Sequence, residues 1–84
     1  MANVTMTPAA LEQLTRLPRV VRERIGTLFR RLQDWPAVSG AKPLTGNLAG
    51  SYRMRTGDYR LRFRVKGETV IVVKIGQRSD FYDE

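Results

Sequence analysis

The 84-residue sequence contains neither cysteine nor histidine. Without cysteine the chain has no disulfide and no thiolate metal site, which fits a reducing cytosol. Without histidine it lacks the commonest general base and metal ligand, so every Ser-His and Cys-His catalytic arrangement is excluded. The eight acidic residues form no cluster that suggests a metal site. We therefore expect neither a bound metal nor another cofactor.

Long hydrophobic runs are absent as well. No segment approaches the roughly 18–20 apolar residues of a membrane span. The start, MANVTMTPAAL, has no basic region followed by an apolar core, which a signal peptide would need. With 42% hydrophobic residues, the composition is that of a globular protein rather than a disordered chain. We expect one domain over residues 1–84, located in the cytoplasm and not in a membrane.

Acidic residues are scarce over one half of the chain. The whole sequence carries a formal net charge of +7. Residues 42–78 contain nine basic side chains but only two acidic ones, Asp58 and Glu68. Both acids follow a glycine in a turn signal, where a turn role is commoner than a catalytic one. Such a local basic excess favours a polyanionic partner, usually nucleic acid, although it can also serve solubility alone.

The basic residues of this segment recur every second position. In SYRMRTGDYRLRFRV, residues 51–65, apolar and aromatic side chains alternate with arginines. A period of two is the side-chain period of a β-strand, so the stretch predicts two strands with one apolar and one cationic face. The arginines of the predicted cationic face are Arg53, Arg55, Arg60, Arg62 and Arg64.

This cationic face has two interpretations. A simply solvated face would mix lysine, glutamate, threonine and serine, with long stems covering apolar surface. Here the outward residues of both strands are arginines, and like charges directly opposite one another destabilise a sheet. A phosphate partner would offset that repulsion, because guanidinium groups bind phosphate bidentately. We therefore favour a phosphate-binding face over a solvated one.

The rest of the chain predicts an α+β fold with the order strand, two-helix hairpin and three-stranded antiparallel meander. Residues 2–6 could form an edge strand, and Thr7-Pro8 has the hydroxyl cap and first-turn proline of a helix start. A second helix should run from Arg19 to about Trp35, and residues 37–50 should form a loop. Strands are expected at 51–56, 58–66 and 69–75. The helical stripes comprise Leu11, Leu14 and Leu17, then Val21, Ile25, Leu28, Phe29 and Leu32.

The two helices should cover one face of the meander. Residues 70–75, VIVVKI, are apolar at nearly every position and predict a central strand covered on both faces. Lys74 would project away from the helices and join the arginines. The residues expected to face the helices are Tyr59, Leu61, Phe63, Ile71, Val73 and Ile75.

The C-terminal stretch GQRSDFY, residues 76–82, also has two interpretations. Phe81 could pack on the core and leave Tyr82 as a surface ring. Alternatively, Arg78 and Tyr82 could lie at the mouth of the cationic face. A tyrosine there could stack on a base or take part in proton transfer. The residue types alone do not separate the two.

The run KPLTGNLAGSYRMRTGDYRLRFRVKGETVIVVKIGQRSDFY resembles the RelE branch of the RelE/ParE toxin superfamily. The shared pattern is a Leu-x-Gly loop, a Tyr-basic-x-basic strand, Gly-Asp-Tyr-Arg, an apolar strand, and Gly-x-Arg followed by an aromatic residue and tyrosine. The order of elements also fits, and the resemblance covers essentially the whole chain. It implies a toxin of a type II toxin–antitoxin system that cuts mRNA in the ribosomal A site.

The resemblance also implies the site residues. Arg53 and Arg55 fall where the family keeps two basic residues, and Arg60 matches its phosphate-binding arginine. Arg78 matches a catalytic arginine, and Tyr82 matches the C-terminal tyrosine. The implied reaction is attack of the ribose 2′-OH on the adjacent phosphate without a metal, leaving a cyclic or 3′-phosphate and a 5′-OH. Beyond the residues that the resemblance covers, we expect Arg62, Arg64 and Lys74 to hold flanking RNA backbone, with a simply solvated position as the alternative for Arg62 and Arg64.

One departure from the family pattern affects the roles of these residues. The best-known RelE pattern has lysines where this chain has Arg53 and Arg55. Since an arginine essentially cannot release its proton, these two side chains are better suited to clamp the transition state electrostatically. The role of general base would then fall to Tyr82. Arg78 would stabilise the leaving group or protonate it through water.

Partners and alternatives follow from the same resemblance. The expected partners are mRNA, the ribosome, and an antitoxin with an acidic or amphipathic segment. A poison of DNA gyrase, as in the ParE branch, is an alternative against which Tyr82 and the Arg53/Arg55 pair argue. An inactive nucleic-acid-binding module is another. Six helix arginines could contact ribosomal RNA or could form a solvated helix face, namely Arg16, Arg19, Arg22, Arg24, Arg30 and Arg31.

Overall fold

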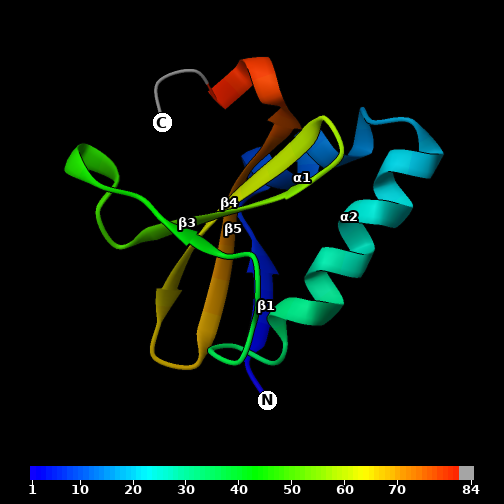
Figure 1. The fold of residues 1–84 in the computed structure, drawn as a ribbon. Helices are drawn as coiled ribbons and strands as arrows, with labels where there is room; N and C mark the ends of the chain where they lie inside the picture. Colours follow the sequence, from blue (N-terminus) through cyan, green and yellow to red (C-terminus); the bar gives the residue numbers. More distant parts are fainter. Residues whose placement is uncertain (82–84) are drawn as a thin grey trace.

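The computed structural model describes residues 1–81 and confirms the α+β fold: over this range, two helices pack on one five-stranded sheet (Figure 1). The sheet order is β1-β5-β4-β3-β2, in which β1 is parallel to β5 and all other neighbours are antiparallel. No helix in this range is long and apolar enough to cross a membrane. The elements are β1 (Asn3–Met6), α1 (Pro8–Thr15), α2 (Arg19–Leu32), β2 (Lys42–Pro43), the 3₁₀ turn η1 (Gly46–Leu48), β3 (Ser51–Thr56), β4 (Tyr59–Lys66), β5 (Thr69–Gln77) and the 3₁₀ turn η2 (Arg78–Phe81).

The helices begin where their capping residues predict. The Thr7 hydroxyl accepts a hydrogen bond from the Ala10 N–H at 3.1 Å, and Pro8 occupies the first turn of α1. Pro18 then precedes α2 with extended backbone, which separates the two helices. Leu11 remains 49% exposed, so the apolar stripe of α1 is narrower than its spacing predicts.

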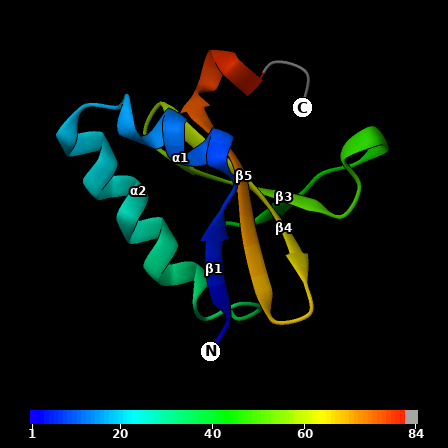
Figure 2. The same ribbon diagram turned by 180° about the vertical axis from the view of Figure 1, so that it is seen from behind.

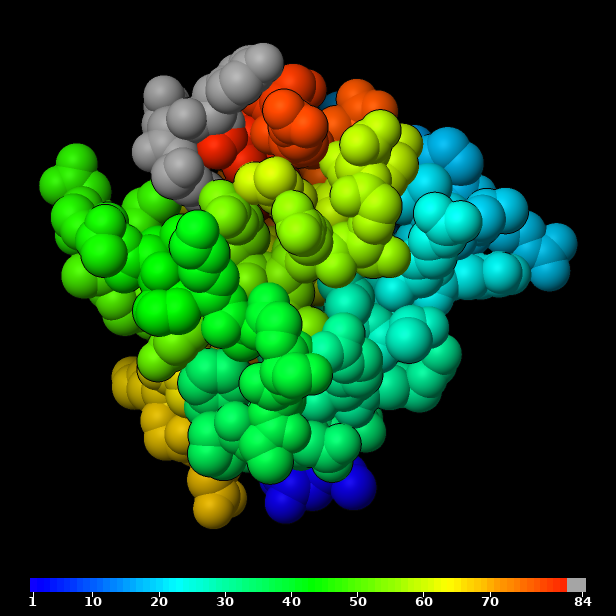
Figure 3. Space-filling model, viewed as in Figure 1, coloured from blue at the N-terminus to red at the C-terminus, as the bar shows by residue number. Residues whose placement is uncertain are grey.

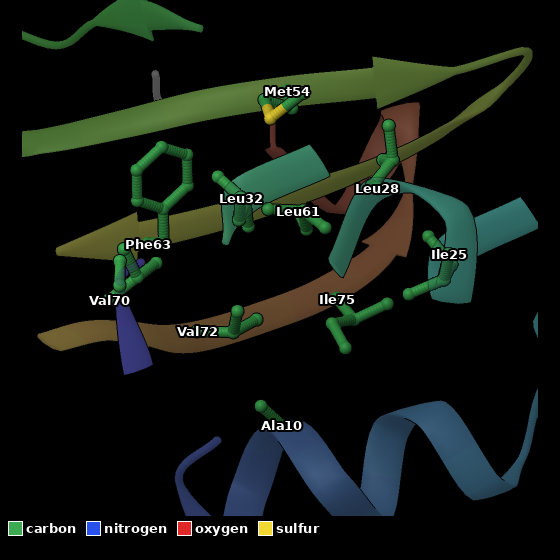
Figure 4. Packing of buried hydrophobic residues seen from close by; sticks show 11 residues of the cluster. Ala10, Ile25, Leu28, Leu32, Met54, Leu61, Phe63, Val70, Val72 and Ile75 are labelled. Carbon is green, nitrogen blue, oxygen red and sulfur yellow. The ribbon is translucent and has the colours of Figure 1, made fainter. Parts of the chain in front are cut away.

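The core lies between the helices and one face of the sheet (Figure 4). The predicted stripe of α2 is confirmed, because its central residues are fully buried against the strands. The Phe63 ring packs edge-on against Trp35, with centroids 5.3 Å apart, and stacks on Tyr52 at 5.5 Å. The core side chains labelled in the figure are Ala10, Ile25, Leu28, Leu32, Met54, Leu61, Phe63, Val70, Val72 and Ile75.

Two tight turns fix the register of the meander. Gly57 and Gly67 each have φ near +59°, a conformation that a side chain disfavours. Each glycine is the first residue of a two-residue loop. One loop connects Thr56 to Tyr59, which pair across β3 and β4, and the other connects Lys66 to Thr69, which pair across β4 and β5. Glycine at the first loop position is typical of the hairpin turns that match the strand twist. The turn therefore determines which arginine of β3 faces which arginine of β4.

A bulge in β5 corrects the predicted core. Arg62 pairs with Lys74 but Phe63 pairs with Val72, so Val73 is an extra residue on β5. One inserted residue shifts the alternation of a strand by one position. Val70 and Val72 therefore face the helices before the bulge, and Ile75 faces the helices after it. The prediction that Ile71 and Val73 belong to this core is therefore wrong. Both are half-buried, so the second face of β5 is only partly covered.

This bulge makes a testable prediction about stability. Val72→Ala should lower the free energy of unfolding by about 2 kcal/mol, because it removes buried methyl groups and leaves a cavity. Ile71→Ala removes more atoms but from a half-buried side chain, and should cost about 1 kcal/mol or less. Urea unfolding of the two variants measures the order. A larger loss for Ile71→Ala would contradict the register.

Residues 37–50 contain more structure than the predicted loop. Lys42 pairs with Arg53 and Pro43 with Tyr52, which adds β2 as a short edge strand beyond β3. Two residues are too few for a periodic signal, and proline is confined to such edges because it lacks an N–H donor. The 3₁₀ turn η1 follows at once. In both views η1 and the chain next to it stand away from the rest of the sheet, on the side opposite α2 (Figures 1 and 2).

Candidate functional site

The strand register aligns basic residues across the sheet. Lys42 on β2 is opposite Arg53 on β3, Arg53 is opposite Arg62 on β4, and Arg62 is opposite Lys74 on β5. Directly paired residues lie on the same face of a sheet. These four residues, which we call the central row, therefore cross four strands. At a spacing of about 4.8 Å per strand the row is about 14 Å long.

A second row lies one step nearer the β3–β4 turn. Arg55 is opposite Arg60, and Arg60 is opposite Gly76 on β5. Arg55 is exposed and Arg60 is half-buried. Two guanidinium groups on adjacent strands repel each other, which disfavours the isolated fold but suits a bound anion. This like-charge pair of the predicted cationic face lies beside a glycine on the third strand.

The turn η2 is fastened to this end of the sheet. The Arg78 backbone N–H donates to the Asp58 carbonyl at 2.7 Å, and the Asp80 carboxylate accepts from the Gln77 N–H at 2.9 Å. An added Cβ at Gly76 would lie 2.5 Å from Asp80 Oδ2, so the absence of a side chain lets η2 approach the strand. Arg78, which is exposed, therefore begins η2 beside the turn that joins Arg55 to Arg60.

Lys74 holds the other side of η2. Its ammonium group donates to the Asp80 carbonyl and lies 4.7 Å from the centroid of the Phe81 ring. Phe81 is only 2% exposed. A cation over an aromatic face is attracted by the ring quadrupole. Sequence reasoning grouped Lys74 with the RNA contacts but missed that it anchors the segment leading to Tyr82, because the contact depends on how the chain folds back.

The other predicted site residues are spread along the face. Arg53 and Arg62 lie at its centre and are half-buried. Arg64 is exposed at the far end, opposite Ser51. Tyr82, the predicted general base, lies outside the described residues. Lys42 was not predicted as a site residue, because only the pairing of β2 brings it beside Arg53.

Most of the helix arginines contact groups on or near their own helices. Arg16 pairs with Glu12 at 2.6 Å and Arg19 with Glu23 at 3.4 Å, and the side chains of both arginines are more than three-quarters exposed. Arg22 donates to the Leu17 carbonyl at 2.8 Å. These contacts favour the interpretation as a solvated helix face, although exposed pairs of this kind contribute little to stability.

Three hollows border the cationic face. One of about 280 Å³ is lined by the Asp58 turn and the start of η2. Another of about 300 Å³ lies along Arg53 and Arg55, and a third of about 450 Å³ lies between Arg53 and the η1 segment. Figure 3 shows the green η1 segment, the yellow-green hairpin and the orange-red C-terminal turn around the upper part of one face. Among residues 1–81 no group of His, Cys, Asp or Glu side chains could hold a metal ion.

Comparison with known proteins identifies a matching family and similar toxins. Residues 4–82 match the family described as the ParE toxin of the type II toxin–antitoxin system parDE. Toxin RelG of Mycobacterium tuberculosis is 35% identical over 83 residues, which cover 95% of this chain and 94% of RelG. Toxin RelE3 of Methanocaldococcus jannaschii is 28% identical over 76 residues, covering 87% of this chain and 86% of that toxin.

Solved structures agree with these sequence relatives. The toxin–antitoxin complex RelBE2 from M. tuberculosis contains a chain that is 28% identical, with a TM-score of 0.79 over 94% of this chain and 93% of that one. The isolated RelE toxin of E. coli shares the fold, with a TM-score of 0.78 at 22% identity over 99% of this chain and 93% of that one. From the family match and the 35% identical relative, the chain belongs to the RelE/ParE superfamily of type II toxin–antitoxin toxins, in its RelE-type branch.

Proposed function

We propose that this toxin is a metal-independent endoribonuclease that cleaves mRNA in the ribosomal A site. The observation that carries the proposal is the register of the cationic face, in which Arg55 is opposite Arg60 and Arg78 begins the turn fastened beside them. Guanidinium groups from two strands and η2 could then bind the non-bridging oxygens of one phosphate. The RelE-type sequence pattern and the toxin relatives support the same activity.

The proposed reaction is an in-line transesterification. The ribose 2′-oxygen forms a bond to phosphorus while the bond from phosphorus to the 5′-oxygen breaks, which gives a 2′,3′-cyclic phosphate and a 5′-OH. Arg55 and Arg60 stabilise the negative charge that builds on the pentavalent phosphorus. Tyr82, in its deprotonated form, accepts the 2′-OH proton. The departing 5′-oxygen takes a proton from a water molecule polarised by Arg78.

Dependence on the ribosome follows from the size of the molecule. Its longest dimension is 31 Å, and the central row crosses only four strands. So small a face offers few contacts to a long flexible RNA, and ordering that RNA costs conformational entropy. A ribosome that already holds the codon in place would remove most of this cost. We therefore propose that the ribosome presents the mRNA to the cationic face.

A cognate antitoxin is the proposed protein partner. The net charge of +7, concentrated over residues 42–78, suits an acidic or amphipathic segment laid on the cationic face. The RelBE2 relative was solved as a toxin–antitoxin complex, which supports a complex of the same kind here. Such a segment would neutralise Arg55 and Arg60 and block access of RNA.

The test is to add the purified full-length toxin to a translating extract and map the 5′ ends of a reporter mRNA. The proposal predicts new 5′ ends inside translated codons, and none when initiation is blocked. Intact mRNA with translation unimpaired would overturn the proposal. Salt-dependent RNA binding without cleavage or toxicity would instead identify the inactive nucleic-acid-binding module.

The ParE family match keeps a gyrase poison as the second candidate. The substitution Tyr82→Phe separates the two functions, since it removes only the phenolic hydroxyl. An endoribonuclease that uses this group in proton transfer should lose at least about tenfold in cleavage rate and most of its toxicity. A gyrase poison should keep its toxicity and produce gyrase-linked DNA breaks while mRNA stays intact.

A further inference from the structure

Residues 42–50, which include β2 and η1, form a wall beside the cationic face. The Leu44 N–H donates to the Ser51 carbonyl at 2.9 Å, which ties the segment to the start of β3. Within η1, the Leu48 N–H donates to the Thr45 carbonyl at 3.2 Å. Lys42, paired with Arg53, ends the central row at the base of this wall. The segment therefore has internal and external hydrogen bonds that give it a fixed shape.

A hollow of about 450 Å³ lies between this wall and β3. That volume is within the usual range of small-ligand sites, roughly 300–1,000 Å³. Arg53 also borders the neighbouring hollow of about 300 Å³, which extends to Arg55. A chain lying across Arg55 and Arg53 could therefore continue into the larger hollow. The lining of the larger hollow includes Lys42, Leu44, Thr45, Asn47, Leu48 and Arg53.

The lining of this hollow combines three kinds of side chain. Lys42 and Arg53 supply positive charge on one side. Leu44 and Leu48 are half-buried and offer apolar surface, whereas Asn47 is exposed and offers an amide with two donors and one acceptor oxygen. A nucleotide presents the complementary set, namely an anionic phosphate, the apolar faces of a base, and a polar base edge.

We propose that this hollow binds the base of a nucleotide next to the scissile phosphate and that Asn47 reads its edge. The proposal rests on the proposed endoribonuclease function. Lys42 and Arg53 hold the intervening phosphate, Leu44 and Leu48 contact the faces of the base, and the Asn47 amide hydrogen-bonds to its polar edge. The segment would thereby determine which codon positions are cut, while the second row acts on the phosphate itself.

A binding experiment tests the pocket without relying on cleavage. The ¹⁵N-labelled full-length toxin is titrated with 5′-phosphorylated RNA trinucleotides that differ in one base. The proposal predicts amide shifts at residues 44–48 and affinities that depend on the base. Asn47→Ala should reduce this discrimination by about 2- to 10-fold, the worth of one hydrogen bond. The chain's other asparagine, Asn3, lies exposed on the far edge strand β1, and Asn3→Ala should leave the discrimination unchanged.

Cleavage mapping in a translating extract supplies the second readout. Asn47→Ala should change the ratio of cleavage between sites that differ in one base by about 2- to 10-fold. Base-independent binding, or shifts confined to β3 and β4, would overturn the pocket even if the toxin cuts mRNA. So would binding of a glutamate-rich peptide but of no trinucleotide. Base-dependent shifts at residues 44–48 with no cleavage would retain the pocket and reject the nuclease.

Discussion

Replacing Arg78 by alanine should lower the single-turnover rate of mRNA cleavage about 100-fold or more. Removing one preorganised group that stabilises charge in a transition state commonly costs about 10²–10³ in rate. Arg78 is suited to this role because its backbone is hydrogen-bonded to the Asp58 carbonyl in the turn that joins β3 and β4. The loss should therefore occur in the chemical step, and binding of RNA should weaken much less.

The controls for Arg78 separate its role from charge alone. Lys66 is exposed at the opposite end of the same face, so Lys66→Ala removes the same formal charge far from the second row. It should keep most of the activity. Arg78→Lys, which keeps the charge but loses the planar guanidinium, should be intermediate. Equal losses of cleavage rate for Arg78→Ala and Lys66→Ala would mean that Arg78 contributes only its positive charge and has no specific role in the reaction.

Replacing Arg55 by threonine should have opposite effects on activity and stability. The variant should lose about 100-fold in cleavage rate, because one of the guanidinium groups of the phosphate site is removed. The free protein should nevertheless gain about 0.5 kcal/mol in free energy of unfolding, since Arg55 lies directly opposite Arg60 and like charges across a sheet repel. A functional group that reduces the stability of the free fold is expected at a binding site.

Urea unfolding and single-turnover cleavage together test this second prediction. The matched control for stability is Arg64→Thr, because Arg64 is exposed on the same strand pair but lies opposite Ser51. That variant should not become more stable. The gain for Arg55→Thr should shrink at high salt, where the repulsion is screened. A loss of stability in Arg55→Thr would contradict the proposed repulsion.

The sequence predicted the parts of the fold that depend on local periodicity. The stripe of Ile25, Leu28 and Leu32 indicated which face of α2 is buried. The alternation in β3 and β4 placed Met54 and Leu61 on one face of the sheet and the arginines on the other. Turn glycines, which have positive φ, set both hairpin positions. These predictions agree with the structure because each depends only on residues that are close together in the chain.

The features that sequence reasoning missed depend on distant contacts. The bulge at Val73 has no sequence signature, so the strict alternation assigned Ile71 to the wrong face. The two residues of β2 are too few for a pattern, which hid the place of Lys42 in the central row. The contact of Lys74 with Phe81 arises only when η2 folds back over Gly76. A nearly uniform apolar strand specifies burial but not the register that brings the predicted site residues together.

The most direct test of the proposed mechanism uses an mRNA with a single 2′-deoxyribose at a mapped cleavage site. Attack by the neighbouring 2′-OH requires that oxygen, so the account predicts that cutting stops at the modified nucleotide and continues at other sites. The wild-type ends should carry a 2′,3′-cyclic or 3′-phosphate and a 5′-OH. Continued cutting at the modified nucleotide, with a 5′-phosphate, would mean that water attacks the phosphate and would contradict the roles of Arg55, Arg78 and Tyr82.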